Sequence, residues 1–145
     1  MPKPNQGTGM PPTDSQAKVQ HLEGTDHQKS RAFSPAVITE GGKTVWLAGQ
    51  TTVTDLEGKD ISGKFDEQAR TIFALLNRTL ERAGGSLANM VTMTVFINDA
   101  RNGDRFVQIR REHFPDGRYP CSALLTISSF ARPGCMIEIQ GVAVI

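Results

Sequence analysis

The sequence has 145 residues, with 16 basic and 15 acidic side chains and a net charge of +1 at pH 7. This length suits a single domain with one hydrophobic core. A charge so close to zero gives no support to nucleic acid or an anionic membrane as a partner, so small molecules are the expected partners. No apolar run approaches the roughly 20 residues of a membrane span. The first 30 residues also lack the apolar stretch of a secretory signal, and we therefore expect a cytoplasmic protein.

Residues 1–30 are rich in Pro, Gly and polar side chains, a composition that cannot bury enough surface to order itself. We predict that they form a polar N-terminal arm in front of one domain over residues 31–145. Such an arm becomes ordered only where the rest of the protein, or a neighbouring subunit, holds it. His21, Asp26 and His27 lie in the arm and have the chemistry of metal ligands, but no helix or hairpin is evident to fix them. We predict a solvated loop there and no metal ion.

Two short strands are predicted where the sequence becomes regular. Residues 37–39 and 44–48 flank the turn residues 40–43, and this pattern predicts a β-hairpin. Residues 49–52 are then expected to leave the strand. Residues 55–59 have the composition of a turn.

Two helices are predicted further along the chain. Apolar residues recur from Phe65 to Ala83 at the spacing of one helical face, and Gly84 and Gly85 end the pattern. Residues 103–114 predict a second helix, which Pro115 ends. Three apolar side chains of this helix are expected to point partly inward: Phe106, Ile109 and Phe114. Three charged side chains are expected to point mostly outward: Arg110, Arg111 and Glu112.

Three further strands complete the predicted domain. Residues 90–98 form a continuous β-branched run typical of a central strand, and residues 121–128 and 135–144 predict the last two strands. The order β-β-α-β-α-β-β predicts an α+β domain, with a mixed sheet and two helices on one of its faces. Nothing remains in the sequence to cover the other face. We therefore expect self-association, with any cleft between subunits.

The sequence offers no cofactor motif and no clear nucleophile. It has no Gly-x-Gly-x-x-Gly, Walker or Cys-x-x-Cys sequence, so we predict no cofactor. Cys121 and Cys135 are expected to be free thiols, as in a reducing compartment. Cys121 lies beside Ser122, but His113 is the only histidine outside the arm and has no spacing typical of a catalytic partner. We interpret Cys121 as a core or interface thiol.

The last predicted strand carries an acid where a buried strand should have none. Strict alternation sends Ile137 and Ile139 to one face and Glu138 to the other. Several stretches, taken together, resemble the RidA (YjgF/YER057c) family. These stretches are VWLAGQ (45–50), QAR (68–70), MTVFIND (93–99), YP (119–120) and IEI (137–139), followed by VAV (142–144).

The resemblance covers the chain from about Phe33 to its end. It implies a chorismate-mutase-like fold, a homotrimer, and a deaminase that hydrolyses reactive enamines or imines to ketones and ammonia. It further implies that Glu138 faces a cleft between subunits and positions or activates a water. Most of the substrate-binding residues expected in this cleft come from two segments: Gly49 and Gln50, and Cys121, Ser122, Ala123 and Leu124. Ala36 and Arg118 complete the expected set.

Two positions depart from the family pattern and place the chain in a subgroup that lacks the family's arginine. Ser122 stands where deaminating members have an arginine that binds the substrate carboxylate, and Ala36 stands in place of a tyrosine. A neutral hydroxyl binds a carboxylate more weakly than a guanidinium does. The usual small 2-imino acid substrate is therefore not expected.

Three interpretations follow from these departures. In the first, the protein deaminates a larger or less acidic enamine, such as the catabolic compound 2-aminomuconate. In the second, Arg118, Arg132 or Arg31 reaches the cleft from another position and restores the missing anchor. In the third, the pocket binds a metabolite without turnover, as a sensor or accessory protein.

Overall fold

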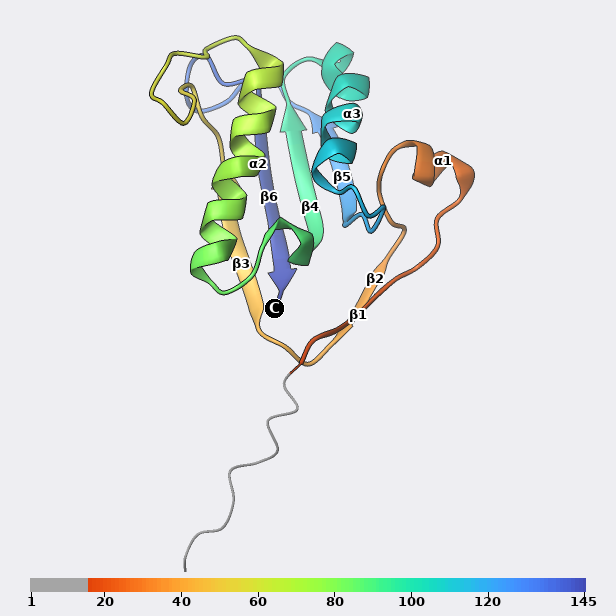
Figure 1. The fold of residues 1–145 in the computed structure, drawn as a ribbon. Helices are drawn as coiled ribbons and strands as arrows, with labels where there is room; N and C mark the ends of the chain where they lie inside the picture. The colour runs from red at the N-terminus through yellow and green to blue at the C-terminus, as the bar shows by residue number, and fades with distance from the viewer. Residues whose placement is uncertain (1–15) are drawn as a thin grey trace, which may run out of the picture.

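A computed structural model describes residues 16–145 and shows a four-stranded sheet with two helices on one face (Figure 1). The sheet has the order β3-β6-β4-β5, in which β6 runs antiparallel to both of its neighbours and β4 runs parallel to β5. Its strands are β3 (Thr44–Gln50), β4 (Met90–Ile97), β5 (Cys121–Thr126) and β6 (Ile137–Val144). The covering helices are α2 (Phe65–Arg82) and α3 (Gly103–His113). The predicted α+β class, mixed sheet and helix placement are confirmed.

The predicted hairpin over residues 37–48 is wrong. Strand β2 (Val37–Glu40) pairs with β1 (Lys18–His21) in a separate two-stranded sheet, whereas β3 pairs with β6. The β3–β6 pairing extends to Lys43, which exchanges both backbone hydrogen bonds with Ile145. The residues between β2 and β3 do form a turn, but burial of β3 against β6 decides its partner. The turn residues give no information about which distant strand pairs with β3.

The part of the expected arm that the structure describes contains β1 and a short helix, α1 (Asp26–Ser30). The sequence predicted neither element. A His21 ring nitrogen of this segment lies 2.9 Å from the carbonyl of Tyr119, just before β5. Shortly after the arm, the Ser34 hydroxyl donates to the same carbonyl (2.6 Å) and the Ser34 N–H donates to the Pro120 carbonyl. Residues before 16 lie outside the described part, so the domain boundary at residue 30 stays a prediction.

The core lies between the sheet and the helices. The apolar stripe of α2 is buried there, with Ile72, Phe73 and Leu80 at most 1 % exposed. Phe106 and Ile109 of α3 are fully buried, as predicted. Among residues 16–145, no helix combines the length and hydropathy needed to cross a membrane.

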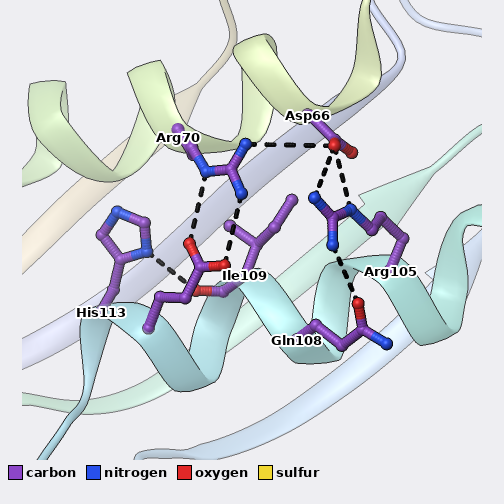
Figure 2. A network of polar contacts seen from close by, with 7 residues as sticks. Asp66, Arg70, Arg105, Gln108, Ile109 and His113 are labelled. Atoms are coloured by element: carbon purple, nitrogen blue, oxygen red, sulfur yellow. Dashed lines mark hydrogen bonds and ion pairs between the residues drawn. The ribbon is translucent and has the colours of Figure 1, made fainter.

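Polar side chains join α2 to α3 along their solvent side (Figure 2). The Arg105 guanidinium donates to the Asp66 carboxylate at 2.8 and 2.9 Å and thereby lowers the pKa of Asp66. Arg70 donates to Glu112 at 3.3 Å. His113 lies at the end of this row, where its ring contacts the Ile109 carbonyl and stacks on Phe73. These contacts align α3 on the sheet, and they give His113 a structural role.

Gln68 is a buried side chain that holds in place the residues leading into β6. It is fully buried, and its amide nitrogen donates to the carbonyls of Ile61 (3.0 Å) and Gly134 (2.7 Å). Its amide oxygen accepts the Met136 N–H at 2.9 Å. Met136 directly precedes β6, so this side chain helps to set the position of the strand that carries Glu138.

Replacing Gln68 with Leu should lower the free energy of unfolding by about 3 kcal/mol or more, because three backbone groups lose buried partners at about 1 to 3 kcal/mol each. Urea denaturation measures this loss. Gln108→Leu is the matched control, since Gln108 is exposed on α3 and its amide binds only the exposed edge of Arg105. The control should change stability by less than about 0.5 kcal/mol. If the two variants unfolded at the same urea concentration, this role of Gln68 would be contradicted.

Candidate functional site

Glu138 lies on the sheet face that points away from the helices. Its neighbours Ile137 and Ile139 are fully buried under the helices, so alternation places the half-buried Glu138 on the opposite face. It pairs with Phe96 of β4, which shares that face. Gly49 of β3 packs against the Glu138 carboxylate so closely that a Cβ at position 49 would overlap it. A side chain at position 49 would push the flexible Glu138 carboxylate out of its present position.

The face around Glu138 carries apolar side chains without cover. Trp46 of β3 is 79 % exposed and Leu125 of β5 is 44 % exposed. Register places both on the same face as Glu138, because Leu125 pairs with Phe96 and Trp46 pairs with Val142, four residues beyond Glu138. Exposed apolar side chains that gather on one face indicate a surface for association.

The predicted substrate-binding residues of β5 fall on both faces of the sheet. Ser122 pairs with Met93 and Leu124 pairs with Val95, and both partners are buried beneath the helices. Cys121 and Ala123 alternate with them and share the face of Glu138. The structure therefore brings Ser122 and Leu124 together, but within one chain it separates them from Glu138.

Arg110 of α3 is a buried cation above Ser122. It is 2 % exposed, its Nη1 donates to the Ser122 hydroxyl (2.6 Å) and its Nη2 donates to the Arg31 carbonyl (2.8 Å). Its guanidinium carbon lies 5.0 Å from the centre of the Phe106 ring. Burial, with a smaller contribution from the nearby Arg31 charge, lowers the pKa of Arg110 to about 10. The group is still charged at neutral pH.

The prediction that Arg110 points outward is wrong. Arg110 lies four residues after Phe106, so one helical face carries both side chains toward the sheet. The long apolar stem of arginine packs well on such a face. That spacing was the sequence signal that could have identified it. The outward prediction holds for Arg111 and Glu112, which are exposed.

A pocket of about 290 Å³ opens beside Arg110 and Ser122, between α3, β5, and α1 with the residues that follow it. Its polar lining also includes His27 and Arg31, and its apolar lining is Phe33, Val107 and Leu124. Arg31 is one of the three arginines considered as a replacement anchor. Its guanidinium pairs with Asp104 at 2.6 Å, and its carbonyl accepts a hydrogen bond from Arg110.

The other candidate residues lie elsewhere. Arg118 is exposed, has Asp116 at 3.9 Å, and lines a separate cavity of about 320 Å³ with His21 and Asn89. Arg132 is exposed in the loop before β6.

Ala36 directly precedes β2, and its carbonyl accepts the Leu22 N–H. Gln50 is the last residue of β3, which continues through a segment expected to leave the strand. Its side-chain amide donates to the Thr51 carbonyl at 2.8 Å.

The two thiols and the possible metal ligands form no cluster in residues 16–145. Cys121 and Cys135 are both free, and the Cys121 thiol donates to the Val91 carbonyl at 3.2 Å. In this part of the chain, no group of three or more His, Cys, Asp or Glu side chains is placed to hold a metal ion.

Comparison with known proteins identifies relatives over most of the chain. The family model described as Endoribonuclease L-PSP matches residues 25–145. A RutC family protein of Pyrococcus horikoshii is 24% identical over 111 residues, which are 77% of this chain and 85% of the relative. Protein DfrA of Myxococcus xanthus is 27% identical over 112 residues, 77% of this chain and 84% of that protein.

Solved structures show the same fold. The Rid-family protein YyfB from Yersinia pestis superposes with a TM-score of 0.75 at 22% identity, over 89% of this chain and 98% of the other. RidA from an Antarctic Psychrobacter has a TM-score of 0.65 at 24% identity, over 73% of this chain and 84% of the other. At these identities the likeness concerns the fold alone. The match of the family model over residues 25–145 shows that the chain belongs to the RidA (YjgF, L-PSP) family.

Proposed function

We propose that the protein is a hydrolytic deaminase of a reactive enamine or imine, with Glu138 as its catalytic residue. The observation that carries this proposal is the placement of Glu138, half-buried, paired with Phe96 and packed against a glycine that leaves its carboxylate room. A carboxylate in such a place can hold a water and accept its proton. Family membership supports the reaction class.

The chemistry needs only water as a second reactant. The enamine is protonated at carbon to give an iminium ion, and the water held by Glu138 adds to the C=N carbon. Glu138 accepts the proton of that water and returns it to the departing nitrogen. The carbinolamine then collapses to a ketone and ammonia and gives its hydroxyl proton to solvent, which replaces the proton that solvent supplied to the enamine carbon. One water is therefore consumed for each ammonia released.

A homotrimer with clefts between subunits is part of the proposal. In the sheet order β6-β4-β5, Glu138 is two strands away from Ser122, which is roughly 10 Å across the strands at the usual spacing. The two residues are also offset along the strands, since they pair with Phe96 and Met93 of β4, and they lie on opposite faces. One chain therefore cannot present both to a small substrate, whereas two adjacent copies can. The exposed Trp46 and Leu125 would be covered by such packing. A cytoplasmic location is also proposed, since two free thiols are typical of a reducing compartment.

An ammonia-release assay tests the proposal. The purified protein is offered 2-aminoacrylate generated in situ and, separately, 2-aminomuconate, with semicarbazide to trap imines as a control. We expect faster ammonia release than in buffer for at least one of the two substrates. Release at the buffer rate with both, together with a metabolite retained on purification, would instead support a binding protein.

A metabolite-binding protein without turnover is the second candidate. It is favoured by the absence of any carboxylate from the lining of the pocket at Arg110 in residues 16–145. A ribonuclease, which the description of the family model names, receives no support from the net charge of +1.

Gly49→Ala offers a second test of the Glu138 site. The new methyl group would overlap the Glu138 carboxylate and displace it from its water, and displacements of about 1 Å can cost on the order of 100-fold in rate. We expect ammonia release to fall at least about tenfold, with an unchanged urea midpoint. Ala48→Ser, at the exposed neighbouring position, should keep the wild-type rate. A Gly49→Ala protein with wild-type turnover would argue against Glu138 as the water-holding group.

A further inference from the structure

Arg110 is a buried positive charge without a negative partner in the described part of the chain. Its guanidinium donates to two neutral oxygens, those of Ser122 and the Arg31 backbone, and no ion pair of residues 16–145 includes it. Its Nε–H is buried with no hydrogen-bond partner. A charge in this state is costly, and neutral hydrogen bonds offset that cost only in part. Buried charges are therefore normally paired, which indicates that an anion completes this site.

The side chains that line the pocket beside Arg110 are suited to bind a small organic anion. Its second cation, Arg31, is already matched by Asp104, so the uncompensated charge is that of Arg110. The Ser122 oxygen accepts from Arg110, which leaves the Ser122 hydroxyl proton free to donate to a ligand. Phe33, Val107 and Leu124 supply an apolar wall. A carboxylate, which is planar and has two oxygens, matches this combination when it is attached to a small apolar group.

We propose that Arg110 is the carboxylate anchor of this pocket, with the Ser122 hydroxyl as the second donor. A guanidinium presents its N–H groups in a planar fork that fits a carboxylate in two-point contact. The pocket volume of about 290 Å³ limits the ligand to a small molecule, and the single unmatched charge with the apolar wall favours a monocarboxylate with an apolar side chain. The inference rests on the proposed function only where it makes this carboxylate part of the substrate. A small 2-imino acid, not expected from Ser122 alone, then becomes a suitable substrate.

Calorimetric titration with propanoate tests this assignment, with propanamide as the uncharged isostere and inorganic phosphate as a tetrahedral anion. We expect saturable binding of propanoate, no binding of propanamide, and weaker binding of phosphate. Arg110→Met keeps the length of the side chain and removes the charge, and it should weaken propanoate binding about 10- to 100-fold. Arg82→Met makes the same chemical change at the exposed end of α2, away from the pocket, and it should bind propanoate as tightly as the wild type does.

Unchanged propanoate binding by a folded Arg110→Met protein would overturn the assignment, as would equal binding of propanamide or a preference for phosphate. Circular dichroism establishes whether this variant folds. If the variant does not fold, a nuclear magnetic resonance titration of the wild-type protein replaces it as the test. The Nε–H signal of Arg110 should then shift saturably with propanoate and stay fixed with propanamide. A signal that stays fixed with both ligands overturns the proposal.

Binding and turnover fail separately in this design. Propanoate binding without ammonia release would retain Arg110 as the anchor and contradict the deaminase. Ammonia release by an Arg110→Met protein at the wild-type rate and KM would keep the deaminase and reject the anchor.

Discussion

Glu138→Gln is expected to remove ammonia release while the protein stays folded and assembled. The amide keeps the size of the side chain, and its contact with Gly49 can be preserved, but it cannot take a proton from water. Loss of a general base lowers rates by about 10²- to 10⁴-fold. Initial rates of ammonia release at neutral pH, measured at several substrate concentrations, give this loss as a fall in kcat with little change in KM.

The matched control for this variant is Glu57→Gln, which makes the same chemical change in the exposed turn before α2. It should retain the wild-type rate. Both variants should elute from a sizing column with the wild-type protein. A Glu138→Gln protein with at least half of the wild-type rate would remove Glu138 from the mechanism, since the isosteric change spares everything except proton transfer.

The helices and the face of Glu138 could be predicted because their signals are local. The stripe from Phe65 to Ala83 predicts a helix, and the structure has α2 over Phe65–Arg82. Alternation along residues 137–139 is enough to place Glu138 opposite Ile137 and Ile139 once β6 lies in a sheet with one face covered. Each of these inferences depends on neighbours within a few residues along the chain.

Strand pairing could not be predicted in the same way. The turn between β2 and β3 is visible in the sequence, but the partner of β3 is β6, about 100 residues away, as their ladder from Thr44 and Val144 shows. Pairing with β2 orders β1, which local composition alone would leave without structure. The grouping of Ser122 with Glu138 depended on the same missing information, because register decides which residues of β5 share a face with β6.

Arg110 illustrates a different limit. Charge alone predicts an exposed side chain, since arginine is rarely buried without a partner. The position of Arg110 on the apolar face of α3 predicts a buried side chain, and the side chain is buried in the structure. The two signals conflict within one sequence, and such conflicts are expected where function sets the residue. The conflict at Arg110 is consistent with an anchor that costs the fold stability and serves a ligand.

The opposite faces of Glu138 and Arg110 make the assembly itself testable. If one substrate needs the water at Glu138 and the charge at Arg110, then one copy must supply the acid and an adjacent copy the guanidinium. A homo-oligomer of Glu138→Gln subunits lacks the acid in every cleft, and one of Arg110→Met subunits lacks the anchor in every cleft. Neither should release ammonia efficiently from 2-aminoacrylate.

Mixed oligomers of these two variants are expected to recover activity. With equal amounts of each subunit assembled at random, about one quarter of all clefts combine an intact Glu138 from one copy with an intact Arg110 from the next, which becomes about one third in trimers that contain both variants. Co-expression with two different affinity tags, followed by purification on both, isolates the mixed species for the ammonia assay. Oligomers that carry both changes on every chain are the control and should stay inactive. Mixed oligomers as inactive as their parents would mean that both groups act from the same chain or that one of them does not act, because a cleft shared between copies must be restored by complementary subunits.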